Sequence, residues 1–343
     1  MRGPGSVVLA VARRLAFFRQ QTDRLAEFRN MNPYSYDSAE LHSNLHLKET
    51  TSKWLRYDVD FPTAHPTQYK ENNTVLGEYF QPRHADKAPL AVIVHGWGDR
   101  SIILCRFLAR TLVKRGITCF ILYLVFHSRR MPEVVRNRLP VLTPEEWLEG
   151  YQVSVIDVHQ VVDWASDRAE INEEQIAVVG VSLGGHVSAI AMGLDKRITA
   201  GVFLVSGGNA EKITWLSRNE AIRKGHTCTE AECHRIRSHY PQYLAEVAKK
   251  GLENVAPVKE CFWTDTLTFA PYLRRRPILM INALWDEAIP KQATLDFWNA
   301  CEKPTIKWFP GTHATVWLWY PLIGRKIARF LTSTFGMQGQ RSA

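Results

Sequence analysis

The chain has 343 residues, of which 45% are hydrophobic and 22% are charged. This composition is typical of a folded globular protein and excludes collagen-like, low-complexity and disulfide-rich miniature proteins. The 43 lysine and arginine residues exceed the 34 acidic residues and give a formal net charge of +9. We interpret this excess as a solvated basic surface, with attraction to an anionic lipid or substrate as the alternative. We expect no nucleic-acid partner, because no basic run is interleaved with aromatic residues.

The segment 6–30 carries apolar residues at helical spacing and predicts an amphipathic helix. We assign residues 1–50 to an N-terminal helical extension. The helix is expected to pack on its own domain or on a second subunit of a homo-oligomer, and peripheral contact with a membrane surface is the alternative. No apolar run approaches the ~18 residues of a membrane span. The six cysteines form no regular framework, so we expect a cytoplasmic protein with reduced thiols, membrane-peripheral if residues 6–30 touch lipid.

Strands and helices follow one another in a regular order after this extension. Two moderately alternating segments, 54–61 and 74–80, predict strands that begin the sheet in antiparallel fashion. The later segments predict buried strands at 90–94, 117–125, 176–181, 200–205, 277–283 and 305–309, and helices at about 102–115, 144–169, 184–194, 291–301 and 315–334. Alternating strands and helices predict an α/β fold with a mostly parallel, doubly wound sheet.

One interval of about 70 residues interrupts this alternation. It is polar and helix-prone, and a structureless loop of that length is improbable. We therefore predict a core formed by residues 51–207 and 277–343, with a helical cap or lid insertion at 208–276. The insertion contains a group of histidine and cysteine residues, for which we expect unligated side chains; a zinc site or a Cys228–Cys233 disulfide is the alternative. These residues are His226, Cys228, Cys233, His234 and His239.

The sequence Gly180-Val-Ser182-Leu-Gly184 matches the pattern G-x-S-x-G between a predicted strand and a predicted helix. A sharp strand-to-helix turn leaves no room for neighbouring side chains, and glycines at 180 and 184 remove those clashes. The hydroxyl of Ser182 would then project above the sheet as a nucleophile. An idle serine in a tight structural turn is the alternative.

A serine hydroxyl needs a base within hydrogen-bond reach, and the base needs an orienting carboxylate. Asp286 and His313 each follow a predicted strand, at the edge where catalytic groups collect in such sheets. The order Ser182, Asp286, His313 is the order that accompanies a serine at this kind of turn. Glu287 is the competing candidate for the acid.

The segment His95-Gly-Trp-Gly98 directly follows the buried strand 90–94. We expect Gly96 to let the backbone pass close to the substrate. The amides of Trp97 and Leu183 would point at the developing negative oxygen and form an oxyanion hole. His95 is expected to be a structural hydrogen-bonding residue.

Together, the His-Gly-Trp-Gly segment, the Gly-Val-Ser-Leu-Gly-Gly turn, Asp286 and the late Gly-x-His resemble the α/β-hydrolase superfamily over roughly residues 70–335. The chain looks most like the group of bacterial esterases, dienelactone hydrolases and prolyl-oligopeptidase-like enzymes. The resemblance implies a serine hydrolase that acts on a small-molecule ester through an acyl-enzyme, with no metal and no organic cofactor. A peptidase, an acyltransferase or a non-catalytic binding protein on the same fold is the alternative.

Side chains near these motifs are candidates for substrate binding. Trp97 and Trp285 can wall an apolar pocket, although packing in the core or under the lid is the alternative. Arg129 can hold a substrate carboxylate, and for it and Arg130 a solvated surface position is the favoured interpretation. His186 is expected to serve packing.

Overall fold

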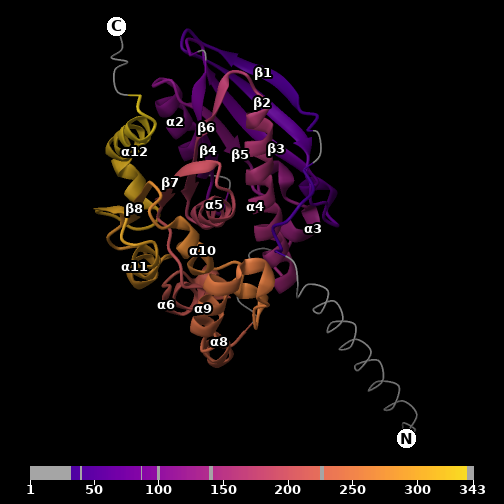
Figure 1. Ribbon diagram of the computed structural model, residues 1–343, viewed down its shortest axis with the longest axis vertical. Coiled ribbons are helices and arrows are strands. Elements are labelled where there is room, and N and C mark those ends of the chain that lie inside the picture. The colour runs from indigo at the N-terminus through magenta and orange to yellow at the C-terminus, as the bar shows by residue number, and fades with distance from the viewer. Residues whose placement is uncertain are drawn as a thin grey trace, which may run out of the picture.

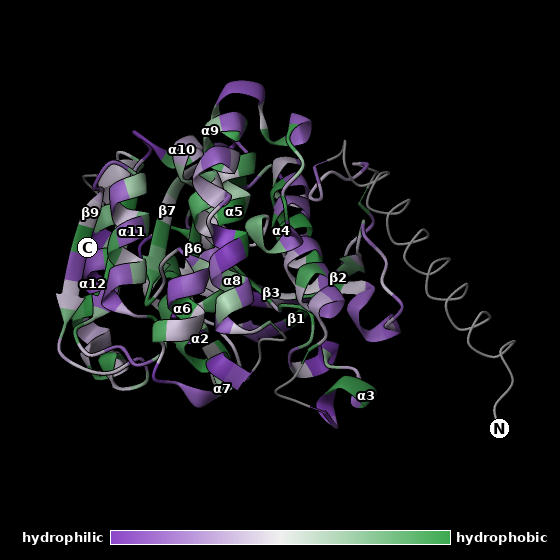
Figure 2. Cartoon of the chain, turned by 90° about the horizontal axis from the view of Figure 1, so that it is seen from below, coloured by the Kyte–Doolittle hydropathy of each residue, from purple (hydrophilic) through white to green (hydrophobic). Residues whose placement is uncertain are grey.

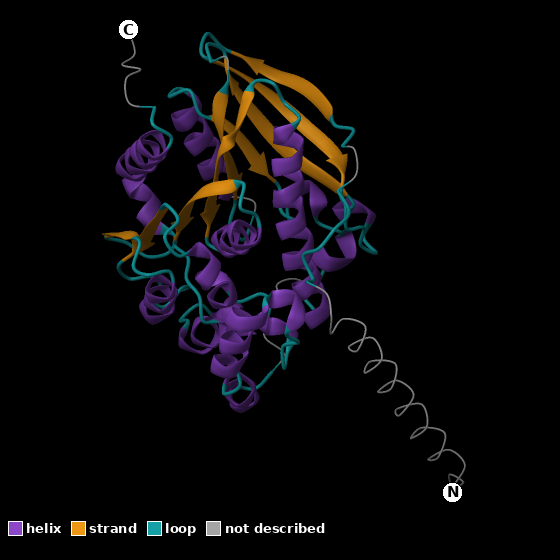
Figure 3. Cartoon of the chain, in the orientation of Figure 1, coloured by secondary structure: helices purple, strands orange, loops and turns teal. Residues whose placement is uncertain are grey.

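A nine-stranded sheet organises the part of the chain that the computed structural model describes, residues 32–38, 41–85, 87–98, 101–138, 142–224 and 228–337. The predicted amphipathic helix at 6–30 lies outside these residues. Helices cover both sides of the sheet (Figures 1 and 3). This arrangement confirms the predicted α/β-hydrolase fold with its mostly parallel, doubly wound sheet.

The strand order is β1-β2-β3-β5-β4-β6-β7-β8-β9. Strands β1, β2, β3 and β5 pair in antiparallel fashion, whereas the pairs from β5/β4 to β8/β9 are parallel. The bounds are β1 (Asn44–Thr50), β2 (Trp54–Pro62), β3 (Thr74–Pro82), β4 (Ala88–Val94), β5 (Thr118–Leu122), β6 (Ile171–Val181), β7 (Ile198–Leu204), β8 (Ile278–Ala283) and β9 (Thr305–Phe309). Because β1 belongs to the sheet, residues 44–50 are part of the core and not of the predicted N-terminal extension.

The central strands are buried on both faces, which explains their continuous apolar sequences. In β4, Leu90, Val92 and Val94 enter one core cluster. Ala91 and Ile93 of the same strand enter the other cluster. Helices α2 (Ser101–Val113) and α12 (Tyr320–Thr334) pack on the second cluster. The first cluster is covered by α4 (Pro144–Ser166), α5 (Leu183–Leu194), α10 (Thr266–Leu273) and α11 (Lys291–Ala300). In Figure 2 the central strand β7 is coloured mainly as hydrophobic, whereas the helices around the sheet carry both hydrophilic and hydrophobic residues.

Two helix starts show how the sequence sets element boundaries. The hydroxyl of Thr143 accepts a hydrogen bond from the amide of Glu146, and the Glu146 carboxylate accepts one from the Thr143 amide, so the predicted capping box is confirmed. The predicted helix at 315–334 is instead a 3-10 turn, η6 (Thr315–Trp319), followed by α12. Pro321 stands in the first turn of α12, where proline favours a helix start.

The insertion between β7 and β8 is helical. It contains α6 (Ala210–Leu216), α7 (Glu220–Lys224), α8 (Glu230–Arg237), α9 (Tyr240–Lys250), η4 (Leu252–Asn254), η5 (Glu260–Phe262) and α10. In Figure 1 its orange helices gather beside α5, with which α10 is in contact. Cys228 and Cys233 are free thiols, so the alternative of a disulfide is wrong.

The remaining short elements are η2 (Lys70–Asn72), η3 (Ser128–Arg130) and α3 (Glu133–Arg136). Among the described residues, no helix combines the length and the apolar character that crossing a membrane requires.

Candidate active site

Ser182 stands at the turn between β6 and α5 with a φ of 52° and a ψ of −115°. A positive φ is rare for a residue with a side chain, so the surroundings must hold this conformation in place. A Cβ atom on Gly180 would lie 2.2 Å from the carbonyl oxygen of Gly184. A Cβ atom on Gly184 would lie 2.2 Å from the carbonyl oxygen of Val94. The two glycines of the motif are therefore required by close backbone approach, as the sequence predicted.

The three residues proposed from the sequence as nucleophile, base and acid lie together at the carboxyl edge of the sheet. The Oγ atom of Ser182 is 3.0 Å from Nε2 of His313. Nδ1 of His313 is 2.9 Å from each carboxylate oxygen of Asp286. An ionised carboxylate can accept but not donate a hydrogen bond, so Nδ1 carries the proton and Nε2 is left to accept from the serine hydroxyl.

Backbone amides hold the Asp286 carboxylate in this position. Its Oδ1 atom accepts from the amides of Ala288, at 2.9 Å, and Ile289, at 2.8 Å. The side chain of Asp286 is 5% exposed and that of His313 is 23% exposed. The acid is thus buried and fixed, while the imidazole can be reached from solvent.

Glu287, the competing acid, occupies a different place. Its carboxylate accepts a hydrogen bond from the backbone amide of His313 at 2.9 Å, whereas the imidazole Nδ1 is bonded to Asp286. Its carbonyl oxygen accepts from the amides of Arg218 and Asn219 in the insertion, at 2.9 and 3.1 Å. Glu287 therefore connects the backbone beside His313 with the insertion.

The turn after β4 lies against Ser182. A Cβ atom on Gly96 would lie 3.0 Å from the carbonyl oxygen of Val181 and 3.2 Å from the Cβ atom of Ser182, which is tighter than most such contacts, so glycine eases this approach. His95 donates from Nδ1 to the carbonyl of Gly96 at 2.7 Å and accepts at Nε2 from the amide of Leu124 at 3.0 Å. Burial lowers the pKa of His95 to about 3, which keeps the ring neutral in this structural position.

The two residues predicted for the oxyanion hole flank Ser182. Trp97 follows Gly96 in the turn after β4, and Leu183 is the first residue of α5. Amides at a helix start have no intrahelical partner and carry a partial positive charge. The position of Leu183 therefore suits stabilisation of a negative oxygen next to Ser182.

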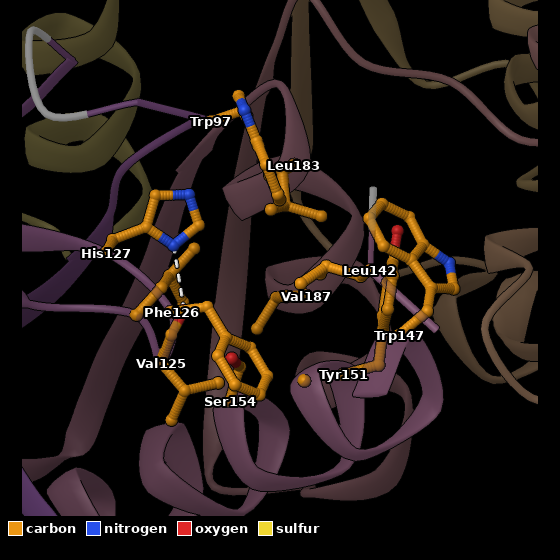
Figure 4. A pocket seen from close by; sticks show the side chains of 12 residues that line it. Trp97, Val125, Phe126, His127, Leu142, Trp147, Tyr151, Ser154, Leu183 and Val187 are labelled. Carbon is orange, nitrogen blue, oxygen red and sulfur yellow. Dashed lines mark hydrogen bonds between the residues drawn. The ribbon is translucent and has the colours of Figure 1, made fainter. Parts of the chain in front are cut away.

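A pocket is lined by Trp97 and by Leu183, the residue that follows Ser182 in the chain (Figure 4). Its empty volume is about 300 Å³, including the open mouth. Its walls are mainly apolar and aromatic: Trp97, Leu124, Val125, Phe126, His127, Leu142, Trp147, Gly150, Tyr151, Ser154, Leu183 and Val187. The ring centroids of Trp97 and His127 are 4.9 Å apart, and those of Trp97 and Trp147 are 6.2 Å apart.

Two residues predicted to bind substrate do not line this pocket. Arg129 is 3.9 Å from the carboxylate of Asp58 in β2, and its guanidinium lies over the ring of Tyr123. Trp285 is 60% exposed at the surface next to Asp286. Arg130 is fully buried and bonded to Asp157 at 2.7 Å, so the interpretation of Arg130 as a solvated surface residue is wrong.

Sequence reasoning missed part of the pocket wall. Trp147 and Tyr151 stand one turn apart on α4, and their i, i+4 spacing is the signal that could have paired them. His127 follows the strand β5 at the same sheet edge as the other site residues. Its Nδ1 atom donates to the carbonyl of Val125 at 2.8 Å, which holds its ring in the wall.

His186 lies one turn into α5, where its Nδ1 atom is 3.2 Å from the hydroxyl of Tyr151. Burial lowers its pKa to about 4. Within the described ranges, no group of three or more His, Cys, Asp or Glu side chains is arranged to hold a metal ion.

The sheet and the strained serine turn define an α/β-hydrolase. The sequence profile of the family described as alpha/beta hydrolase domain containing 18 matches residues 2–213, more than half of the chain. The chain belongs to this family. The matched part includes Ser182 and ends before Asp286 and His313, so the last two rest on the geometry above.

Comparison with other known proteins agrees with this fold. The chain is 26% identical to the polyketide transferase grgF from Penicillium sp. over 285 residues, which are 74% of this chain and 87% of that protein. An acetyl xylan esterase from Paenibacillus sp. R4 superposes with a TM-score of 0.62 at 16% identity, over 92% of this chain and 93% of that chain. The α/β hydrolase GrgF from Penicillium sp. sh18 superposes with a TM-score of 0.53 at 18% identity, over 81% of this chain and 98% of that chain.

Proposed function

We propose that this protein is a serine hydrolase that cleaves carboxylic esters through an acyl-enzyme. The observation that carries the proposal is the continuous hydrogen-bonded path from Ser182 Oγ to His313 Nε2, 3.0 Å, and from His313 Nδ1 to Asp286, 2.9 Å. A serine hydroxyl is a weak nucleophile alone, and this arrangement supplies its base and the group that orients the base.

In the first half of the reaction, Ser182 Oγ attacks the ester carbonyl carbon while its proton moves to Nε2 of His313. The negative charge that develops on the carbonyl oxygen is stabilised by the amides of Leu183 and Trp97. Asp286 stabilises the imidazolium that has formed. The C–O bond to the alcohol then breaks, and Nε2 returns the proton to the leaving oxygen, which leaves an acyl group on Ser182.

In the second half, water takes the place of the alcohol. His313 accepts a proton from the water, whose oxygen attacks the acyl carbon. The bond to Ser182 breaks, the proton returns to Oγ, and the carboxylic acid leaves. The 23% exposure of the His313 side chain is consistent with access of water to Nε2.

The pocket beside Ser182 supports a small apolar or aromatic substituent. Leu142, Phe126 and Val187 offer apolar surface, and Trp97 and Trp147 offer ring faces. Such walls favour burial of hydrocarbon and place few polar groups against it. We therefore propose that this pocket binds either the acyl group or the alcohol group of the ester.

Acyl transfer is the second candidate. It is favoured by the relative that is 26% identical and named a polyketide transferase. The acyl-enzyme on Ser182 is the same in both reactions, and an alcohol or thiol acceptor replaces water in the second half. Assays with and without added acceptors separate the two: a transferase forms more acylated acceptor than free acid, whereas a hydrolase forms free acid.

The proposal is tested with Ser182→Ala. We expect loss of p-nitrophenyl ester turnover and of labelling by a fluorophosphonate, with an unchanged circular dichroism spectrum and melting temperature. Ser188→Ala, which removes a buried hydroxyl from the same helix α5, is the matched control and should keep both signals. Turnover or labelling that survives in Ser182→Ala would overturn the assignment.

A further inference from the structure

A set of large apolar side chains is exposed around the His313 side of the site. We call it the mouth patch. Trp285 is 60% exposed and Leu318 is 83% exposed. The full set is Ile103 and Phe107 on α2, Leu284 and Trp285 after β8, Leu318 and Trp319 on η6, and Leu322 on α12. Single exposed apolar residues are ordinary, but a group gathered at one edge of a sheet indicates an interaction surface.

Contacts between these elements join α2, α12, η6 and the segments beside His313. The ring of Phe107 lies 5.8 Å from that of Tyr320, at the junction of α2 and α12. The indole N–H of Trp319 donates to the carbonyl of Pro310 at 2.7 Å. The amide of Trp285 donates to the carbonyl of Gly311 at 3.0 Å, two residues before His313. Trp285 and Trp319 of the mouth patch thus lie against the segment that leads into His313.

Basic residues stand directly behind the apolar end of α12. Leu322, Arg325, Lys326 and Arg329 are all exposed and follow the spacing i, i+3, i+4, i+7. This spacing places them along one solvent-facing stripe of the helix. Neither α2 nor α12 contains an acidic residue, and no acidic residue occurs after Glu302. The surface therefore attracts a partner with negative charge.

We propose that the mouth patch docks on an anionic lipid bilayer. Leu318 and Leu322 would enter the boundary between headgroups and acyl chains, where amphipathic surfaces bury about 5–10 Å deep. Lys326 lies four residues beyond Leu322, about 6 Å along the helix axis at 1.5 Å per residue. With the axis of α12 along the membrane normal and Leu322 inserted first, that offset brings Arg325 and Lys326 to the level of the lipid phosphates.

A bilayer fits this surface better than a protein does. Going from the bilayer interior outward, the leucines would lie in the acyl region, the two tryptophans beside them, and the basic residues at the depth of the phosphates. This order matches the layers of a membrane, in which tryptophan is enriched at the interface. Basic residues near an anionic leaflet each add about 1 kcal/mol of binding, which corresponds to about fivefold in affinity.

Vesicle co-sedimentation of the full chain tests the proposal, with phosphatidylcholine vesicles against vesicles containing one third phosphatidylserine. We expect binding to the anionic vesicles that weakens as salt is raised. The double variant Leu318→Ser/Leu322→Ser should lose at least tenfold in partitioning, because two exposed leucines no longer enter the acyl boundary. The triple variant Arg325→Gln/Lys326→Gln/Arg329→Gln should lose about a hundredfold on anionic vesicles alone.

The matched controls are Val258→Ser, at an apolar residue of the insertion that is 60% exposed, between Leu322 and Leu318, and Lys249→Gln on α9. Both should bind vesicles as the unchanged chain does. Failure to bind anionic vesicles, or binding that both patch variants retain, would overturn the proposal. So would a change of oligomeric state in Leu318→Ser/Leu322→Ser, or capture of an acidic protein without vesicle binding. Sedimentation needs no turnover, so its outcome is separate from that of the proposed ester hydrolysis.

Discussion

At the scale of single residues, the backbone of Ser182 carries strain that its neighbours offset. A non-glycine residue at positive φ costs about 1–3 kcal/mol. The amide of Ser182 donates to the carbonyl of Leu204 at 2.8 Å, and its carbonyl accepts from the amide of Gly185 at 2.8 Å. These bonds come from β7 and α5 respectively. The strained turn is therefore held by the two elements that meet there. Its conformation directs the Ser182 hydroxyl toward His313.

The roles of the two neighbouring acids can be separated by isosteric substitution. Asp286→Asn should lower kcat/KM for a p-nitrophenyl ester by about three to four orders of magnitude, because the amide would favour the wrong imidazole tautomer. Glu287→Gln should change it by less than about tenfold, since the amide oxygen of glutamine can still accept from the His313 backbone N–H. Steady-state kinetics on both variants give the answer. A larger loss in Glu287→Gln than in Asp286→Asn would reverse the assignment.

The second glycine of the serine turn allows a test of packing. Gly184→Ala would place a Cβ atom 2.2 Å from the Val94 carbonyl and 2.4 Å from that of His95. Both neighbours are backbone atoms at the end of β4 and cannot rotate away. We expect destabilisation of about 3 kcal/mol or more, with loss of turnover. Gly324→Ala is the control, because its Cβ would make ordinary contacts with the side chains of Tyr320, at 3.4 Å, and Thr111, at 3.7 Å. Equal melting temperatures for the two variants would contradict this account.

At the scale of elements, strands buried on both faces were predictable, because a short continuous apolar sequence between turn residues favours a buried strand over other elements. β4 and β8 agree with the predicted segments to within two residues. β1 was missed because its side chains are mostly exposed, and its strand form depends on pairing with β2. The start of β6 was missed for the same reason, since residues 172–175 are polar and are either exposed or only partly buried.

The candidate site likewise contains residues that could be predicted from the sequence and residues that could not. Ser182, Asp286 and His313 could be located because each lies within four residues after the end of a strand, and the sheet fixes where that strand ends. The pocket wall could not be located from the sequence. It depends on how the segment after β5 packs against α4, and these two segments are separated along the chain. Arg130 shows the difficulty most clearly. A charged residue in a polar segment is expected to face solvent, and its partner Asp157 lies 27 residues further along the chain.

Arg130 connects the segment behind the pocket with α4. Its guanidinium donates to the carbonyls of Tyr123, at 2.8 Å, and Asn72, at 2.7 Å, as well as to Asp157. Phe126 and Ser128 in the same segment have positive φ angles of 59° and 50°, so its conformation needs such support. Arg130 thereby fixes the wall that presents Phe126 and His127 to the pocket.

Removal of this buried cation should be costly. Arg130→Met leaves the Asp157 carboxylate buried without its charge partner, and we expect a loss of about 3–5 kcal/mol in the free energy of unfolding. Urea denaturation followed by circular dichroism measures it. Arg130→Met/Asp157→Asn should recover part of the loss, because the unpaired charge is gone while the bond from Thr63 can remain. A single variant within about 1 kcal/mol of the unchanged protein would show that the ion pair contributes little.

At the scale of the whole molecule, the interior holds several histidines that folding keeps neutral. Burial lowers the pKa values of His95, His159 and His186. The unfolded chain binds protons at these residues near pH 6.5, whereas the folded protein does not until lower pH. Protonation therefore favours unfolding, and stability falls as the pH decreases below about 6.5. The molecule should be most stable at neutral or weakly alkaline pH with respect to these three groups.

His186 makes this dependence measurable. Its ring contacts the Tyr151 hydroxyl, and the charges of Asp265, which raises its pKa, and His313, which lowers it, act on it more weakly than burial does. With a folded pKa of about 4 against 6.5, it alone should lower the free energy of unfolding by about 2 kcal/mol between pH 7 and pH 5. His186→Asn should reduce the difference between urea titrations at these two pH values by that amount. Ser188→Ala, in the same helix, should retain the full difference, so that equal pH dependence in the two variants would show that His186 is not the group responsible.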